Sequence, residues 1–205
     1  PVSFDGEEPY FNSLQSWYLD VETGEWHVAE DNNYVKNGSF EADRRSIPCP
    51  AKPVQDYLLG WTTEIIEGNK VAVGSPDSPI LNYENSEADR KTVIGEKSLF
   101  IGDKTRFRRR IYQTITSTPY VSLPDGHYTL TARLKNSEGL DRLEMYVESE
   151  GKRFSCRIKE ETPEWRTIEI RRVKVRGGKV EIGFYVEGVA DAWARIDDVV
   201  LKRSR

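Results

Sequence analysis

The chain has 205 residues, of which 37% are hydrophobic and 31% charged, and its formal net charge is −4. This length suits one large all-β domain, or a domain with an extension. Basic and acidic residues are interspersed and form no long basic block, which argues against nucleic acid as a partner. No apolar run approaches the roughly 18 residues that a membrane span needs, so no membrane insertion is expected.

Residues 1–34 differ from the rest of the chain and are predicted to form an N-terminal extension. Residues 17–28 predict two short aromatic strands around a Thr-Gly turn. This hairpin either docks on the main domain, with Trp17 and Trp26 packed against it, or is the tail of a preceding domain. Because the chain starts at Pro1 without an initiator Met or a signal peptide, we expect a mature product or an excised piece of a larger protein.

Residues 35–205 carry an almost continuous strand signal and form the second predicted unit. Apolar and polar residues alternate between recurring turn sequences, as in residues 128–134. This period of two is typical of half-buried antiparallel strands with one apolar and one wet face. Only residues 79–92 read poorly as strand, and there we expect a long loop with a helical turn. About nine strands fit the count, so the predicted fold class is all-β: a two-sheet antiparallel β-sandwich, joined as a jelly roll, behind the N-terminal extension.

Carboxylates stand among apolar neighbours at both ends of this second unit. Glu41 closes the segment 37–41, and Asp197 with Asp198 lies in the segment 196–201. Both segments read as strands, and a buried carboxylate needs a cation or hydrogen-bond donors as partners. We therefore expect the first and last strands to lie side by side and to share a structural calcium, which prefers hard oxygen ligands. Salt bridges at the strand ends are the alternative.

Six short motifs follow one another along residues 35–203. In chain order they are Asn37-Gly38-Ser39-Phe40-Glu41, Gly60-Trp61, Gly95-Glu96-Lys97-Ser98-Leu99, Tyr112-Gln113-Thr114-Ile115, Gly126-His127-Tyr128-Thr129-Leu130 and Ile196-Asp197-Asp198-Val199-Val200-Leu201. Together and in this order they resemble the galactose-binding-like jelly rolls, and especially the carbohydrate-binding modules of families 4, 9 and 22. The resemblance speaks more strongly to the fold than to the ligand.

This resemblance implies a non-catalytic domain appended to a secreted polysaccharide-degrading enzyme. The expected location is therefore secreted, periplasmic or at the cell surface. The resemblance also implies a calcium between the first and last strands. The matching ligand positions are Glu41 and Asp197 by side chain, with Gly38 or Ser39 by backbone carbonyl. Trp61 matches a core position of the family.

Sugar-binding surfaces combine aromatic faces with polar side chains, so the wet faces of the predicted strands are where a sugar would bind. The candidate ligand-binding residues, from alternation and from their position before the closing motif, are Arg108, Arg110, Tyr112, Tyr146, Tyr185 and Trp193. Two guanidiniums beside a tyrosine favour an acidic sugar, such as a uronic-acid polymer, because arginine binds carboxylate through paired hydrogen bonds. The alternative is a set of cross-strand ladders, in which glutamates of neighbouring strands pair with these arginines and only solvate the sheet. Those glutamates are Glu144, Glu148, Glu181 and Glu187.

The predicted function is non-catalytic carbohydrate binding, which would target a covalently linked glycoside hydrolase or lyase to a plant-type or acidic polysaccharide. One alternative is a structural or protein-docking spacer with no glycan ligand. The other is a glycoside hydrolase or lyase domain. Catalysis has little support, because no Ser/His/Asp, Cys/His or HExxH pattern accompanies the two histidines.

The chain has two cysteines, Cys49 and Cys156, too few for a disulfide scaffold. They either form a single bridge or stay apart. In the second case Cys156, on the apolar face of its predicted strand, is a small buried hydrophobe.

Overall fold

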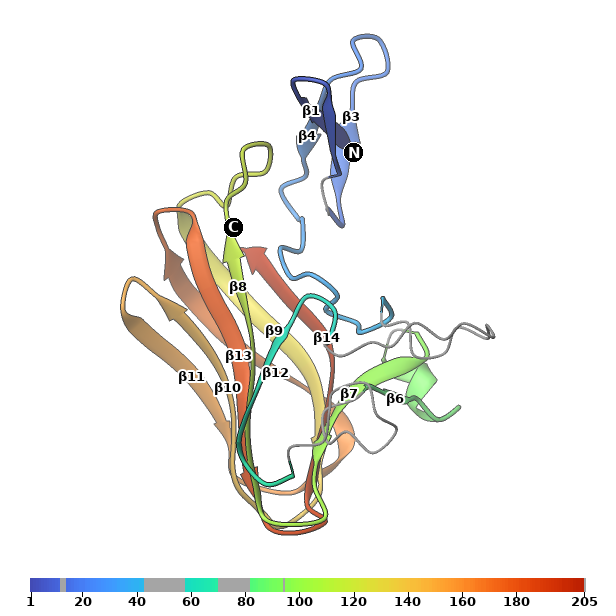
Figure 1. The fold of residues 1–205 in the computed structure, drawn as a ribbon, viewed down its shortest axis with the longest axis vertical. Coiled ribbons are helices and arrows are strands. Elements are labelled where there is room, and N and C mark those ends of the chain that lie inside the picture. The colour runs from blue at the N-terminus through green and yellow to red at the C-terminus, as the bar shows by residue number, and fades with distance from the viewer. Residues whose placement is uncertain (12–13, 43–57, 70–81, 94, 205) are drawn as a thin grey trace.

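The structure is a computed structural model that describes residues 1–11, 14–42, 58–69, 82–93 and 95–204. Most of these residues lie in antiparallel strands (Figure 1). The elements in chain order are β1 (Val2–Asp5), β2 (Glu8–Phe11), β3 (Trp17–Leu19), β4 (Trp26–Val28), β5 (Thr62–Glu67), β6 (Asn82–Glu84), the 3-10 helix η1 (Asp89–Lys91), β7 (Lys97–Gly102), β8 (Phe107–Thr116), β9 (Gly126–Asn136), β10 (Leu140–Ser149), β11 (Lys152–Ile158), β12 (Thr162–Val175), β13 (Lys179–Gly188) and β14 (Trp193–Arg203).

Two five-stranded antiparallel sheets form the body of the molecule (Figure 1). One has the strand order β11-β10-β13-β8-β5 and is called here the β8–β13 sheet. The other has the order β12-β9-β14-β7-β6 and is called the β9–β14 sheet. Their apolar faces meet in one cluster of buried side chains. The predicted two-sheet antiparallel β-sandwich is therefore confirmed.

The period-two pattern of the sequence places every second residue of the central strands in this core. On β9, Tyr128, Leu130, Ala132 and Leu134 are at most 1% exposed, whereas the residues between them are half-buried. Burying a large apolar side chain contributes roughly 1.5–3 kcal/mol, so these positions fix which face of the strand points inward.

Trp61 lies in the core, as its motif position predicted. Its ring packs between Phe40 and Phe184, with centroid distances of 5.7 and 6.2 Å. Its indole N–H donates a hydrogen bond to the Asn37 carbonyl oxygen at 3.2 Å. The side chain therefore ties the opening segment of the sandwich to the β8–β13 sheet.

The extension consists of two hairpins, β1–β2 and β3–β4, the second of which is the hairpin predicted for residues 17–28. Trp26 is half-buried and Trp17 is 40% exposed. The packing of Trp17 on the main domain stays a prediction.

The chain then runs from the extension along β14. The Tyr34 N–H donates to the Leu201 carbonyl oxygen at 3.1 Å. The Asn33 amide donates to the Val199 carbonyl oxygen at 3.2 Å and accepts from the Leu201 N–H at 2.9 Å. The two ends of the predicted main domain therefore lie side by side.

The opening segment 37–41 is a turn and not the strand that its sequence suggested. Asn37 and Phe40 adopt φ values of 50° and 58°, which interrupt an extended backbone. The helical turn expected within residues 79–92 is present as η1. No helix in the described segments is long and apolar enough to cross a membrane.

Candidate functional site

Five of the six predicted ligand-binding residues lie on the outer face of the β8–β13 sheet. They are Arg108, Arg110 and Tyr112 of β8, Tyr146 of β10 and Tyr185 of β13. Cross-strand register sets Arg110 opposite Tyr185, and sets both Tyr112 and Tyr146 opposite Gly183. Trp193 lies on β14 of the other sheet and does not join this group.

The arginines of this face are held by carboxylates of both neighbouring strands. Arg110 lies 3.2 Å from the Glu64 carboxylate of β5 and 2.7 Å from the Glu181 carboxylate of β13. Arg108 contacts one glutamate of each of the same two strands. Glu181 and Glu187 therefore form the cross-strand pairs offered as an alternative to sugar binding. The other two predicted partners, Glu144 and Glu148, pair with Arg142 and Arg153 instead. Such part-exposed pairs contribute only about 0–1 kcal/mol each, but they hold the guanidinium planes in fixed directions.

Tyr146 is buried beneath this polar layer. Its hydroxyl donates to Glu181 at 2.9 Å and accepts from Arg110 Nε at 3.0 Å, and the Arg153 guanidinium covers its ring at 3.7 Å. The ring crosses over Gly183, where an added Cβ would lie 2.7 Å from the tyrosine oxygen. Burial raises the pKa of Tyr146, so its phenol stays protonated and positions the two charged groups.

Tyr112 and Tyr185 are the half-exposed rings of this face. The Arg110 guanidinium stacks 4.0 Å from the Tyr112 ring centroid, and the Arg142 guanidinium stacks 4.6 Å from that of Tyr185. The face therefore alternates phenol rings with guanidinium and carboxylate groups, and each ring has a cation beside it.

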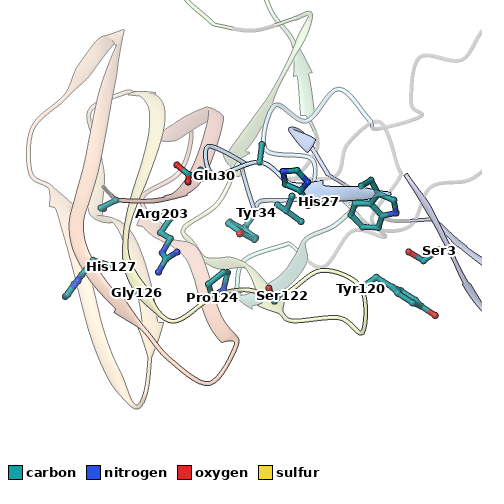
Figure 2. Close-up of a pocket in the computed structure, with 14 residues that line it drawn as sticks. Ser3, His27, Glu30, Tyr34, Tyr120, Ser122, Pro124, Gly126, His127 and Arg203 are labelled. Carbon is teal, nitrogen blue, oxygen red and sulfur yellow. The ribbon is translucent and has the colours of Figure 1, made fainter. Parts of the chain in front are cut away.

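A second feature is a cleft of about 860 Å³ between the extension and one end of the sandwich (Figure 2). Trp26, Tyr34 and Tyr120 line it, as do both histidines of the chain, His27 and His127. No sequence pattern predicted this cleft, because its lining residues come from the extension, the loop before β9 and the end of β14.

Asp197 lies on the outer side of β14, where a bulge follows it in the pairing with β9. Its side chain is fully buried and accepts hydrogen bonds from the Asp198 N–H at 2.7 Å and the Asn85 amide at 3.3 Å. Burial, and next to it the charges of Asp198 and Glu41, raise the pKa of Asp197 to about 8. In the parts of the chain that the structure covers, no basic side chain forms an ion pair with Asp197.

Of the other predicted calcium ligands, Glu41 influences Asp197 electrostatically, and Gly38 bonds to Val199, two residues after Asp197. Glu41 acts on the charge of Asp197, and its Oε1 accepts the Lys97 N–H at 2.7 Å. The Gly38 carbonyl oxygen accepts the Val199 N–H at 2.9 Å, and Ser39 lies in the same turn.

A buried carboxylate that neighbouring carboxylates destabilise fits a hard cation. Within the described ranges no three His, Cys, Asp or Glu side chains gather as a metal group, so carbonyl oxygens would have to complete the ligand shell.

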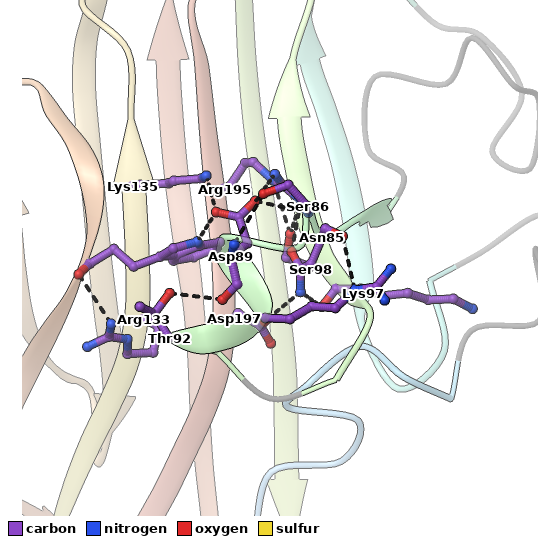
Figure 3. Close-up of polar contacts among 12 residues, drawn as sticks. Asn85, Ser86, Asp89, Thr92, Lys97, Ser98, Arg133, Lys135, Arg195 and Asp197 are labelled. Carbon is purple, nitrogen blue, oxygen red and sulfur yellow. Dashed lines mark hydrogen bonds and ion pairs between the residues drawn. The ribbon is translucent and has the colours of Figure 1, made fainter.

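A network of polar side chains covers the β9–β14 sheet beside this corner (Figure 3). Asp89 of η1 accepts hydrogen bonds from Lys135 Nζ at 2.6 Å, Trp165 Nε1 at 2.7 Å and Arg195 at 3.1 Å. Asn85 joins the network to the corner of Glu41 and Asp197, because it accepts from Arg195 at 2.9 Å and donates to Asp197. No sequence pattern pointed to Asp89 or Asn85, since their partners lie far away in the chain.

Cys156 is a free, half-buried cysteine that packs against the core. This agrees with its interpretation as a small hydrophobe. Cys49 lies outside the described residues.

Comparison with known proteins gives no match by sequence and several matches by fold. No protein-family model matches the chain, and neither does any curated protein. A family 61 carbohydrate-binding module, solved in complex with β-1,4-galactotriose, shares 24% identity over 84% of this chain and 99% of its own, with a TM-score of 0.60. The enzymatically active domain of bacteriophage CBA120 tailspike protein 4 shares 16% identity over 84% of this chain but 21% of its own, with a TM-score of 0.56. One of the promiscuous carbohydrate-binding modules of the β-sandwich superfamily shares 12% identity over 95% of this chain and 77% of its own, with a TM-score of 0.50.

At these identities the likeness establishes the fold alone. The chain has the β-sandwich that carbohydrate-binding modules use. The same sandwich also occurs in an enzymatically active tailspike domain, so function has to be argued from the sites of this chain.

Proposed function

We propose that this chain binds carbohydrate without catalysing a reaction, and that the outer face of the β8–β13 sheet is a binding surface. The observation that carries the proposal is the alternation of phenol rings with ion-paired guanidinium and carboxylate groups on that face. Aromatic surface packs against the C–H groups of a sugar, and polar groups bind its hydroxyls. Groups that are already held in place lose less conformational entropy when a ligand binds.

Each residue of the face has a role in this proposal. Tyr112 and Tyr185 offer their half-exposed rings, and Arg108 and Arg110 offer N–H donors beside them. Tyr146 is a positioning residue, because it is buried and holds Arg110 from below. Trp193 lies on the other sheet, so any role in binding would belong to a different surface.

For the ligand we propose a plant-type polysaccharide. The fold neighbour solved with β-1,4-galactotriose makes neutral galactan the first candidate. An acidic polysaccharide is the alternative, but its carboxylate would compete with Glu64 and Glu181 for Arg110. We further propose that the chain is covalently linked to a glycoside hydrolase or lyase in a secreted, periplasmic or cell-surface protein. It would then raise the local concentration of the enzyme on its substrate.

The test is affinity electrophoresis in gels that contain galactan, xylan, cellulose derivatives or polygalacturonate. We expect at least one polysaccharide to retard the chain, and Tyr112→Ala or Arg110→Ala to weaken binding roughly tenfold, a loss of about 1.4 kcal/mol. Arg171→Ala is the matched control, since Arg171 lies on β12 of the other sheet and pairs only with Glu169 among the described residues. Equal retardation of the wild type and the three variants would show that the outer face of the β8–β13 sheet does not bind the polysaccharide.

We also propose that a calcium binds at the corner of Glu41 and Asp197, with backbone oxygens of Gly38 or Ser39. Asp197 supports this, because it is buried and forms no ion pair with a basic side chain of the described residues. Calcium that binds only the folded state at 100 times its dissociation constant stabilises the fold by about 2.7 kcal/mol. Thermal melts should therefore shift upward with calcium and downward with chelator, and Asp197→Asn should abolish the shift.

Glu138→Gln serves as the control for this experiment, because Glu138 is an exposed residue in a turn far along the chain from these ligands. Its melts should respond to calcium as the wild type does. A wild-type melt that is indifferent to both calcium and chelator would refute the calcium proposal and leave carbohydrate binding standing.

A structural or protein-docking spacer is a second candidate function, and the ion-pair ladders favour it, because they satisfy the charges of the sheet face without any ligand. A chain that no polysaccharide retards, while it stays folded and monodisperse, would support the spacer. A hydrolase or lyase role is the third candidate, and release of reducing or unsaturated sugar ends from the same polysaccharides would reveal it.

A further inference from the structure

The cleft between the extension and the sandwich differs from the sheet face in being enclosed on two sides. Its volume of about 860 Å³ falls within the range of roughly 300–1,000 Å³ that small-molecule sites occupy. One wall is β4 and the residues after it, and the opposite wall is the loop 117–125 (Figure 2).

Buried hydrogen bonds fix the wall that the extension supplies. The Asn32 side chain is 1% exposed and accepts the N–H groups of Gln15 and Ser16 at 3.0 and 3.1 Å. The Ala29 N–H donates to the Ser16 carbonyl oxygen at 3.1 Å. These bonds hold β4, which carries Trp26 into the cleft.

The opposite wall is a tight turn. The Leu123 side chain is 3% exposed, and its N–H donates to Ser117 Oγ at 2.8 Å. The Thr118 N–H donates to the Val121 carbonyl oxygen at 2.8 Å. Tyr120 lies at the tip of this turn and lines the cleft. A ligand would therefore find both aromatic walls already ordered, which lowers the entropic cost of binding.

The floor of the cleft offers neutral hydrogen-bonding groups. Tyr34 packs edge-on against Tyr128 at a centroid distance of 5.9 Å, and the Tyr128 hydroxyl donates to the Pro124 carbonyl oxygen at 2.7 Å. Burial raises the pKa of Tyr34, so its phenol is a hydroxyl that can both donate and accept at neutral pH.

Among the described lining residues, the carboxylate and the guanidinium groups are one of each, from Glu30 and Arg203. Arg203 donates to the Asp125 carbonyl oxygen at 2.9 Å. Aromatic walls, hydroxyl and imidazole groups and one side chain of each of these charges match an uncharged polyol better than an anion.

We propose that this cleft is a second ligand site of the chain and that it binds a short neutral oligosaccharide. Trp26 and Tyr120 would pack on the sugar rings from opposite walls, and Tyr34 and the imidazoles would bind hydroxyls. For its ligand class this inference rests on the proposed function, but its location is independent of the sheet face.

The histidines give a direct readout. The chain contains two histidines, and both line the cleft, so every imidazole signal in an NMR spectrum of the labelled protein reports on it. The full chain is titrated with β-1,4-galactotriose, xylotriose, cellotriose and trigalacturonate. We expect at least one neutral trisaccharide to shift the imidazole signals with saturation. Trp26→Ala and Tyr120→Ala should each weaken that binding at least about tenfold, and Trp26→Phe should restore part of it.

Trp17→Ala is the matched control, because Trp17 belongs to the same hairpin but is exposed and does not line the cleft. It should leave the titration unchanged, and unchanged amide spectra elsewhere would show that the variants are folded. Shifts confined to amides of β8, β10 and β13 would overturn the cleft site and leave the proposed function intact. If trigalacturonate alone shifted the imidazole signals, the proposal that the ligand of the cleft is neutral would be overturned. No shift with any of the four sugars would overturn the cleft site together with the proposed function for these glycans.

Discussion

At the scale of single residues, Asp89 is a carboxylate with several hydrogen-bond and ion-pair partners. It lies under the Lys135 and Arg195 cations and accepts further hydrogen bonds from Trp165 and Ser86. Burial opposes its charged form, but these hydrogen bonds outweigh burial and hold the pKa of Asp89 well below its usual range. This one side chain therefore anchors η1 to the β9–β14 sheet.

Replacing Asp89 should cost stability in a pH-dependent way. Asp89→Asn leaves two half-buried cations without their carboxylate, which we expect to lower the free energy of unfolding by about 3 kcal/mol at pH 7. An acid with a lowered pKa in the folded state stabilises the fold above its unfolded pKa, here 3.8, and loses that contribution as the pH falls further. The difference between wild type and variant, measured by urea unfolding, should shrink below about pH 4. A difference that stays constant from pH 7 to pH 3 would contradict this account.

Gly183 is the residue that allows Tyr146 to cross β13. An alanine Cβ there would lie 2.6 Å from the Ile111 carbonyl oxygen and 2.7 Å from the Tyr146 hydroxyl. Because the backbone carbonyl cannot move, we expect Gly183→Ala to destabilise the fold by about 1–3 kcal/mol. In a double-mutant cycle, part of this cost should disappear when Tyr146 is also alanine. Additive effects in that cycle would mean that the two residues do not constrain each other.

At the scale of elements, the Asn33 side chain joins the extension to β14, beside the Tyr34 N–H bond to Leu201. Asn33 is 7% exposed and bonds to both Val199 and Leu201. Asn33→Ala would leave a buried donor and a buried acceptor of β14 without partners, at a cost of about 2 kcal/mol. Hydrogen exchange should also become faster at the Leu201 amide. Unchanged exchange at that amide would show that the extension does not protect β14.

The inward and outward faces of the strands were predictable, because the alternation of apolar and polar residues along each strand sets them. On β8, Ile111 and Ile115 point inward while Arg110 and Tyr112 point outward, as alternation requires. The strand expected over segment 37–41 was wrong: Asn37-Gly38 is itself a turn signal, and Asn37 and Phe40 have φ values of 50° and 58°.

The candidate sites were only partly predictable. Alternation identified which residues of β8, β10 and β13 face outward, but not that Arg153 covers Tyr146. Trp193 was grouped with the others by its place before the closing motif, and strand order puts it on the opposite sheet. The cleft forms where the extension lies against the end of the sandwich, and no local sequence pattern predicts that contact.

At the scale of the whole molecule, the two sheets of the sandwich supply the faces, and the extension supplies one wall of the cleft. Both sheets share one buried core, so the outer face of the β8–β13 sheet and the cleft are held on the same scaffold. The proposed role of this scaffold is binding, and both candidate surfaces combine aromatic rings with polar side chains that suit a sugar.

Whether this chain binds carbohydrate is decided by a screen of the folded, full chain against immobilised neutral and acidic plant polysaccharides. We expect saturable retention on at least one of them and competition by its free oligosaccharide. Absence of retention on every polysaccharide, with circular dichroism showing an intact β fold in the same buffer with calcium, would contradict carbohydrate binding.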